Sequence, residues 1–101
     1  MNGLKKQTAG LLRASNRQRV MLIETDIETA RTFLQLAGTQ LSMGNIERVT
    51  RLVFIARIAH DTMGRFLSRV ADPEDRKRLH EELHGLDEEI RDVERRTPRM
   101  A

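Results

Sequence analysis

Apolar residues recur along three consecutive segments of the chain at steps that alternate between three and four residues. Only a helix places positions with this spacing on one side of the backbone. The three series consist of Ile23, Ile27, Ala30, Leu34, Ala37 and Leu41; of Ile46, Val49, Val53, Ala56, His60, Met63, Leu67 and Val70; and of Leu79, Leu83, Leu86, Ile90 and Val93. The pattern predicts an all-α fold in which helices pack along these three lines.

The first helix has two candidate starting points. Thr25 followed by Glu28 forms a capping box, which satisfies free backbone N–H groups at the start of a helix and favours a first helix over about 26–43. A start near residue 17 would leave this capping box unused. We expect the later start, so that residues 1–22, with their weak helical spacing, form an N-terminal arm or a separate helix.

Turn residues separate the three predicted helices. Gly44 suits the end of the first helix and Asn45 suits the cap of the second, so the first two helices are expected to form a tight antiparallel hairpin. The second helix is predicted over about 46–71. The Asp72-Pro73 pair is a helix start signal and predicts a third helix over about 73–96. Together these segments predict a small up-down bundle of three main helices.

The composition fits a single helical domain, which we expect to span residues 1–101. The chain contains no Cys, Trp or Tyr and only three Phe, so its core must be aliphatic, and it has neither a disulfide framework nor a thiolate metal site. No apolar run approaches the roughly 20 residues that a membrane span needs. The first residues also lack the apolar stretch of a secretory signal. We therefore expect a soluble, cytoplasmic protein.

Charge is distributed unevenly, although the formal net charge is only +3. Residues 1–19 carry five bases and no acid, residues 46–71 carry five arginines against two acids, and residues 72–101 carry ten acids against seven bases. Such asymmetry favours electrostatic association of two copies, or of the two ends of one copy. The basic residues of the arm suit contacts with phosphate groups; they are Lys5, Lys6, Arg13, Arg17 and Arg19. They lack interleaved aromatics and a helix-turn-helix signature, so we expect no nucleic-acid partner.

The second predicted helix carries more apolar side chains than one contact stripe requires. Besides its main series it contains Leu52, Phe54, Ile55, Ile58, Ala59 and Phe66. A helix with so wide an apolar surface must touch at least two neighbours, so we expect it to be the central helix and to reach the interface of a symmetric homodimer. The residues expected to bind the partner are Phe54, Ile58 and Met63, with Arg51 and Arg65 as charges at the rim.

The hairpin of the first two helices resembles a single tetratricopeptide repeat over residues 30–61. At the spacing of that repeat, Phe33 takes the large aromatic position and Gly44 is the turn glycine. The other matched positions are Leu36, Ala37, Val49, Val53 and Ala56. Gln40 and Asp61 depart from the pattern, because an aromatic residue and a proline are usual there, and no second repeat follows. The resemblance implies a repeat-like helical hairpin and a role in protein interaction.

Residues 80–84 match the H-E-x-x-H pattern of zinc metallopeptidases. His80 and His84 lie on one helical face at i and i+4, and Glu81 has the place of the residue that activates a zinc-bound water. A catalytic zinc also needs a third protein ligand and an open position, and the extended metzincin pattern fails because Asp87 stands where its Gly should be. His80, His84 and Asp87 fall at i, i+4 and i+7, which makes them the candidate ligands of a divalent ion on the helix surface. We expect no metal, no cofactor and no enzymatic activity. A divalent-metal-binding protein, or a metal-dependent hydrolase that uses this segment, is the alternative.

His60 occupies a position in the second apolar series. The string from His60 to Gly64 resembles the phospho-accepting box of some sensor histidine kinases, which implies a histidine phosphotransfer module as a further alternative. The structural interpretation is a core histidine that forms a hydrogen bond across an interface, with Asp61 or its copy as the partner. The function that we expect is a non-enzymatic protein–protein interaction or assembly module.

Overall fold

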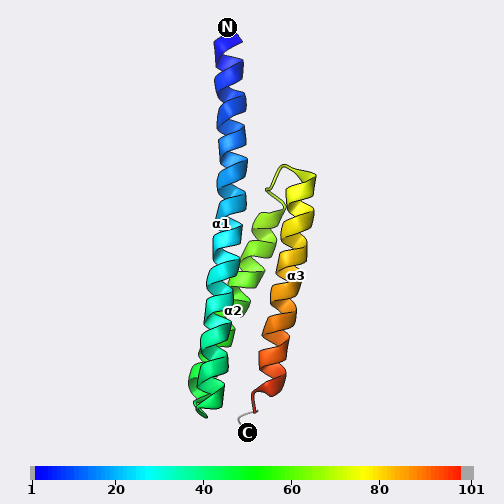
Figure 1. Cartoon of the computed structure of the whole chain (residues 1–101). Helices are drawn as coiled ribbons and strands as arrows, with labels where there is room; N and C mark the ends of the chain where they lie inside the picture. Colours follow the sequence, from blue (N-terminus) through cyan, green and yellow to red (C-terminus); the bar gives the residue numbers. More distant parts are fainter. Residues whose placement is uncertain (1, 99–101) are drawn as a thin grey trace.

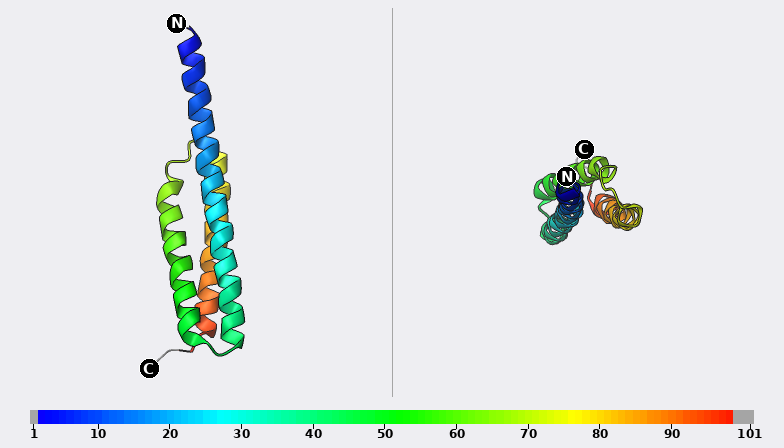
Figure 2. Two further views of the ribbon diagram at one scale, coloured as in Figure 1. Left: turned by 90° about the vertical axis from the view of Figure 1, so that its left-hand side faces the viewer. Right: turned by 90° about the horizontal axis from the view of Figure 1, so that it is seen from above.

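Three long helices that pack side by side make up the fold (Figures 1 and 2). The computed structural model describes the backbone of residues 2–98 and the side chains of residues 15–98. Helix α1 spans Asn2–Ser42, α2 spans Ile46–Leu67 and α3 spans Pro73–Arg96. The predicted all-α, up-down bundle is confirmed. Helix α2 contacts two neighbours, as expected, but so do α1 and α3, so the three helices share the centre of the bundle.

Helix α1 begins at Asn2 and not near residue 26, so the predicted start of the first helix is wrong. The helix continues through Thr25, whose carbonyl oxygen accepts a bond from the Thr29 hydroxyl at 2.9 Å. Upstream of the capping box, Ile23 is only 1% exposed. Burying such a side chain is worth roughly 1.5–3 kcal/mol, whereas a cap is worth about 1 kcal/mol. Packing therefore overrides the capping signal.

The N-terminal part of α1 projects beyond the connection between α2 and α3 (Figures 1 and 2). Two hydrogen bonds mark the level at which this connection crosses α1. The Ala71 backbone N–H donates to Asn16 Oδ1 at 2.8 Å, and Arg19 donates to the Arg69 carbonyl oxygen at 3.0 Å. The predicted arm is thus helical, and the molecule measures 66 × 18 × 18 Å. The side chains of Lys5, Lys6 and Arg13 lie outside the described residues.

The turn between α1 and α2 is the tight hairpin that its sequence predicts. Gly44 has a φ of +78°, in the left-handed region that L side chains rarely adopt. The Asn45 N–H donates to the Gln40 carbonyl oxygen at 2.9 Å and satisfies one of the last carbonyls of α1. Asn45 Oδ1 accepts a bond from the Arg48 N–H at 3.4 Å, which caps α2.

We expect Gly44→Ala to lower the free energy of unfolding by about 1 kcal/mol, because the left-handed conformation costs an L residue roughly 1–2 kcal/mol. Sterics do not contribute, since no atom lies within 4 Å of the added Cβ. Gly64→Ala is the matched control in the interior of α2, where the added Cβ is equally free. It should stabilise the protein by about 0.5–1 kcal/mol. Denaturant unfolding of both variants measures the difference, and equal effects would contradict the prediction.

Helix α2 ends at Leu67, earlier than the predicted boundary near residue 71. The Val70 N–H donates to the Leu67 carbonyl oxygen at 3.1 Å, a tight i→i−3 bond that follows the helix. Val70 is still only 1% exposed, so the apolar spacing predicts its burial but not its departure from the helix. Asp72 then accepts a bond from the Glu74 N–H at 2.9 Å, and α3 has the predicted bounds.

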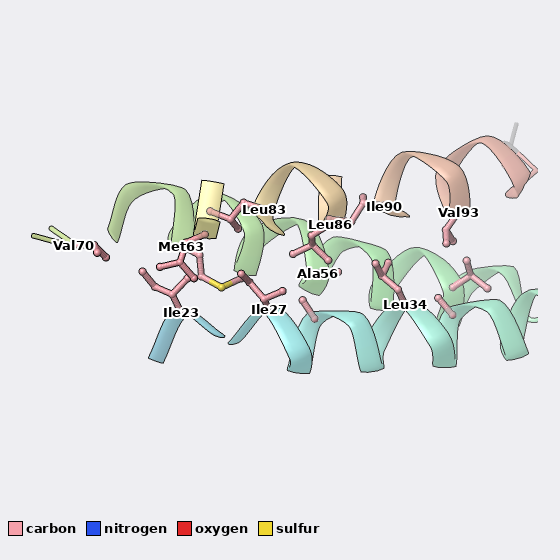
Figure 3. Packing of buried hydrophobic residues seen from close by; sticks show 14 residues of the cluster. Ile23, Ile27, Leu34, Ala56, Met63, Val70, Leu83, Leu86, Ile90 and Val93 are labelled. Carbon is pink, nitrogen blue, oxygen red and sulfur yellow. The ribbon is translucent and has the colours of Figure 1, made fainter. Parts of the chain in front are cut away.

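The core lies between the three helices and is aliphatic, as predicted (Figure 3). Its buried members are Ile23, Ile27, Ala30, Leu34, Ala37, Val49, Ala56, Met63, Val70, Leu79, Leu83, Leu86, Ile90 and Val93. The other five residues of the predicted series, Leu41, Ile46, Val53, His60 and Leu67, are only partly buried. In the part of the chain that the structure describes, no helix has the length and hydropathy of a membrane span.

Candidate functional site

The outward side of α2 carries large exposed apolar side chains. Phe54 is 64% exposed and Ile58 is 50% exposed, and their spacing of four residues places them one turn apart on the same side. Arg51 and Arg65 are exposed on the same side, one toward each end of the helix. The structure thus brings four of the predicted binding residues to one surface, which we name the α2 face (Arg51, Phe54, Ile58 and Arg65).

Met63 does not belong to the α2 face. It is 2% exposed and lies in the core among Ile23 and Ile27, so its prediction as an interface residue is wrong (Figure 3). The flexible, unbranched side chain of methionine fills such gaps between helices. Sequence reasoning also left Ile55 and Phe66 out of the binding set, although they are 44% and 38% exposed. The sequence signal for their exposure is their position outside the main apolar series of α2.

Arginine side chains border the apolar part of α2. Arg51 lies 3.2 Å from Glu47 in an exposed ion pair within the helix. The Arg69 guanidinium lies 5.1 Å from the centroid of the Phe66 ring, in a cation–π contact. Exposed ion pairs contribute about 0–1 kcal/mol to stability. Replacing Glu47 with a carboxylate of a binding partner would therefore cost Arg51 little free energy. The α2 face therefore has an apolar centre and a basic rim.

Phe54 also borders an open groove of about 770 Å³ between the start of α2 and the end of α3. The groove is lined by Val49, Thr50, Val53, Phe54, Arg57, Glu94, Arg95, Thr97 and Pro98. Arg57 donates to Glu94 Oε1 at 2.8 Å, so these two charged groups of the lining bind each other. Small-molecule sites usually aim a few polar groups at the ligand. The groove is better described as an extension of the apolar surface around Phe54.

Arg57 joins α2 to α3. Its guanidinium donates to the carboxylates of Asp87 and Glu94. The bond from Arg57 to Asp87 lowers the pKa of the Asp87 carboxyl and raises the pKa of Arg57. The side chain of Asp87 is only 18% exposed, so solvent screens this pair less than a surface pair. The bond therefore stabilises the contact between α2 and α3.

Two further ion pairs join α1 to the other flank of α3. Arg78 bonds to Glu24, and this bond raises the pKa of Arg78. Arg31 Nε lies 3.5 Å from Glu89 Oε2. Because Glu24 and Arg31 both reach toward α3, they mark the side of α1 that faces this helix.

The candidate metal ligands of α3 do not converge. His80 and His84 are exposed, and His84 Nε2 lies 3.2 Å from Glu88 Oε1. Asp87 is bound by Arg57 of α2, so a cationic guanidinium occupies the carboxylate that a metal would need. Among the residues with described side chains, no group of three His, Asp or Glu residues is placed to hold a metal ion. The segment therefore lacks the three-ligand arrangement of a catalytic zinc site.

His60 has the geometry of a structural histidine. Its side chain is 22% exposed, and Nδ1 lies 3.0 Å from Oδ1 of Asp61. The hydrogen-bond partner is thus the neighbouring aspartate of the same chain. A phospho-acceptor must be reached by a partner enzyme, and a ring that is largely covered is a poor acceptor. This geometry favours the structural interpretation of His60.

No known protein family, curated protein or solved structure matches this chain. The two resemblances that the sequence suggests are confined to residues 30–61 and 60–64. The surfaces of this molecule are therefore the guide to its function.

Proposed function

We propose that this protein is a non-enzymatic protein–protein interaction and assembly module, which forms a symmetric homodimer through the α2 face. The observation that carries the proposal is the exposed pair of Phe54 and Ile58 on α2. On α3, by contrast, no large apolar side chain of the described residues is exposed. Contiguous apolar surface rimmed by polar residues marks interaction sites more often than solvated faces.

A second copy of the chain suits the α2 face. In a twofold interface the same patch serves both subunits, so the apolar centre of one copy covers that of the other. The core of this chain is thin, and a small helical domain gains stability when it buries further apolar area by oligomerising. The arginine-rich α2 and the acid-rich segment 72–101 also favour association of two copies.

The substitution Phe54→Asp tests this proposal. We expect wild-type protein to have the mass of a dimer by light scattering, and Phe54→Asp to weaken dimerisation by about 100-fold, because a carboxylate would be buried among apolar groups. His80→Asp places the same charge on the exposed side of α3 and should leave the dimer unchanged. Since Phe54 is exposed in the single chain, circular dichroism should show intact helices in both variants. A monomeric wild type, or a dimer that tolerates Phe54→Asp, would contradict the proposal.

A further inference from the structure

A second line of exposed residues runs along α1 into the turn that follows it. We name it the α1 stripe, and it consists of Leu22, Thr25, Thr29, Thr32, Leu36, Thr39 and Met43. Its steps alternate between three and four residues, which is the spacing of a coiled-coil seam. Every member is exposed, including Leu22 at 53%, Leu36 at 47% and Met43 at 71%. The helix thus has two seams, one in the core and one without a partner in the single chain.

The α1 stripe lies on the side of the α1–α2 hairpin that faces away from α3. Glu24 and Arg31 mark the α3 side of α1, and Leu36 lies about 140° around the helix from Arg31. On α2, Arg57 marks the α3 side, and the exposed Ile55 lies about 160° around the helix from it. The apolar part of α2 therefore extends from Phe54, which borders the groove toward α3, around the helix to Ile55, which lies on the same side of the molecule as the stripe.

Three of the four threonines of the stripe use their hydroxyl groups inside α1. The hydroxyls of Thr29, Thr32 and Thr39 donate to the carbonyl oxygen four residues earlier, at 2.9, 3.1 and 3.3 Å respectively. Such bonds engage the hydroxyl proton within the helix and leave the methyl group as the free end of the side chain. The α1 stripe is consequently more apolar than its composition suggests.

The α1 stripe carries no charge, although charged residues make up 33% of the chain. The exposed side of α3 has the opposite character, with Lys77, His80, Glu81, His84, Glu88 and Arg91. In the sequence, the uncharged spacing continues upstream of the stripe at Leu4, Thr8, Leu11, Ser15 and Gln18. An uncharged line of this length differs from an ordinary solvated helix surface, which alternates charges with polar residues.

We infer that the α1 stripe lies at the twofold axis of the homodimer and packs against the α1 stripe of the second copy. The inference rests on the proposed function, since it concerns the same assembly and adds α1 to its interface. Residues at a twofold axis meet their own copies, so charges there would face like charges, and an uncharged line suits this position. A charged partner would instead be matched by opposite charges, which the stripe does not have. The arginines of the α2 face then lie at the rim.

A single thiol at the centre of the α1 stripe tests its position. The chain has no cysteine, so Thr32→Cys introduces one thiol per copy. Two such thiols near the axis have Cα atoms within about 7 Å, and mild oxidation should link them. We expect Thr32→Cys to give a species of doubled mass on a non-reducing gel. We expect His80→Cys on α3 to run mostly at the mass of one chain. Equal cross-linking of the two variants would overturn the inference.

The substitution Leu36→Glu tests the contact energetically. It places like charges across the axis and should weaken dimerisation by about 100-fold, whereas His80→Glu should not. If Phe54→Asp dissociates the dimer and Leu36→Glu does not, the inference fails and the proposed function stands. If only Leu36→Glu dissociates it, the stripe is the interface and the assignment to the α2 face fails. A monomeric wild type overturns both.

Discussion

Leu86→Ala should lower the free energy of unfolding by about 2–5 kcal/mol. Leu86 is 0% exposed and lies at the middle of the apolar line with which α3 packs on α1 and α2 (Figure 3). The substitution loses the transfer free energy of the removed methyl groups and leaves a cavity between the helices. Since a domain has only about 5–15 kcal/mol of stability, the loss is a large part of the total.

Denaturant unfolding, followed by circular dichroism, measures this loss as a lower transition midpoint at a similar slope. Met21→Ala is the control, because Met21 lies on α1 at 64% exposure and should change stability by less than about 0.5 kcal/mol. A Leu86→Ala variant that unfolds at the wild-type midpoint would show that α3 is not packed as described.

Asp87→Asn should lower the free energy of unfolding at pH 7 by about 1–2 kcal/mol, because it removes the charge that Arg57 binds. The effect should depend on pH. The pKa of Asp87 is lower in the folded chain than in the unfolded chain, so the carboxylate stabilises the fold above its ordinary pKa of about 3.9. That contribution is lost as the pH falls through the folded-state pKa.

Unfolding measured at pH 7 and at acidic pH checks this sign. The difference between wild type and Asp87→Asn should shrink as the pH falls, because protonation removes the same charge from the wild-type protein. Asp92→Asn is the control. Asp92 pairs only with Arg95 and Arg96 of its own helix among the described residues, and its side chain is 55% exposed. A constant difference across the pH range would contradict the role of the Asp87 carboxylate.

The fold could be predicted where the signals are local. The alternating spacing of α3 is a property of consecutive residues, and Asp72-Pro73 and Thr97-Pro98 bound this helix without help from the rest of the molecule. The start of α1 could not be predicted in the same way. The capping box at Thr25 is also local, but it competes with the burial of Ile23, and that burial depends on the other two helices.

The candidate site could be predicted in part. Phe54 and Ile58 lie outside the main apolar series of α2, and this separation is visible in one helix alone. Met63 belongs to that series, and the same pattern predicts its burial, so its prediction as an interface residue contradicts its own spacing. The spacing along α3 places Asp87 with the histidines of that helix, whereas its partner Arg57 lies on α2. Polar contacts between helices leave no periodic trace in a single sequence.

The ion pairs on the flanks of α3 fix its register along the hairpin. The buried line of α3 repeats leucine, isoleucine and valine at nearly regular intervals, so a slide of two turns would keep much of its apolar burial. Arg57 lies against Asp87 and Glu94, which are two turns apart on α3, while Glu24 and Arg31 make matching pairs from α1. A slide of two turns in either direction would leave Arg57 only one of its two carboxylates, and it would move Arg78 away from Glu24. The ion pairs thus favour one alignment of α3 among several that bury nearly the same apolar surface.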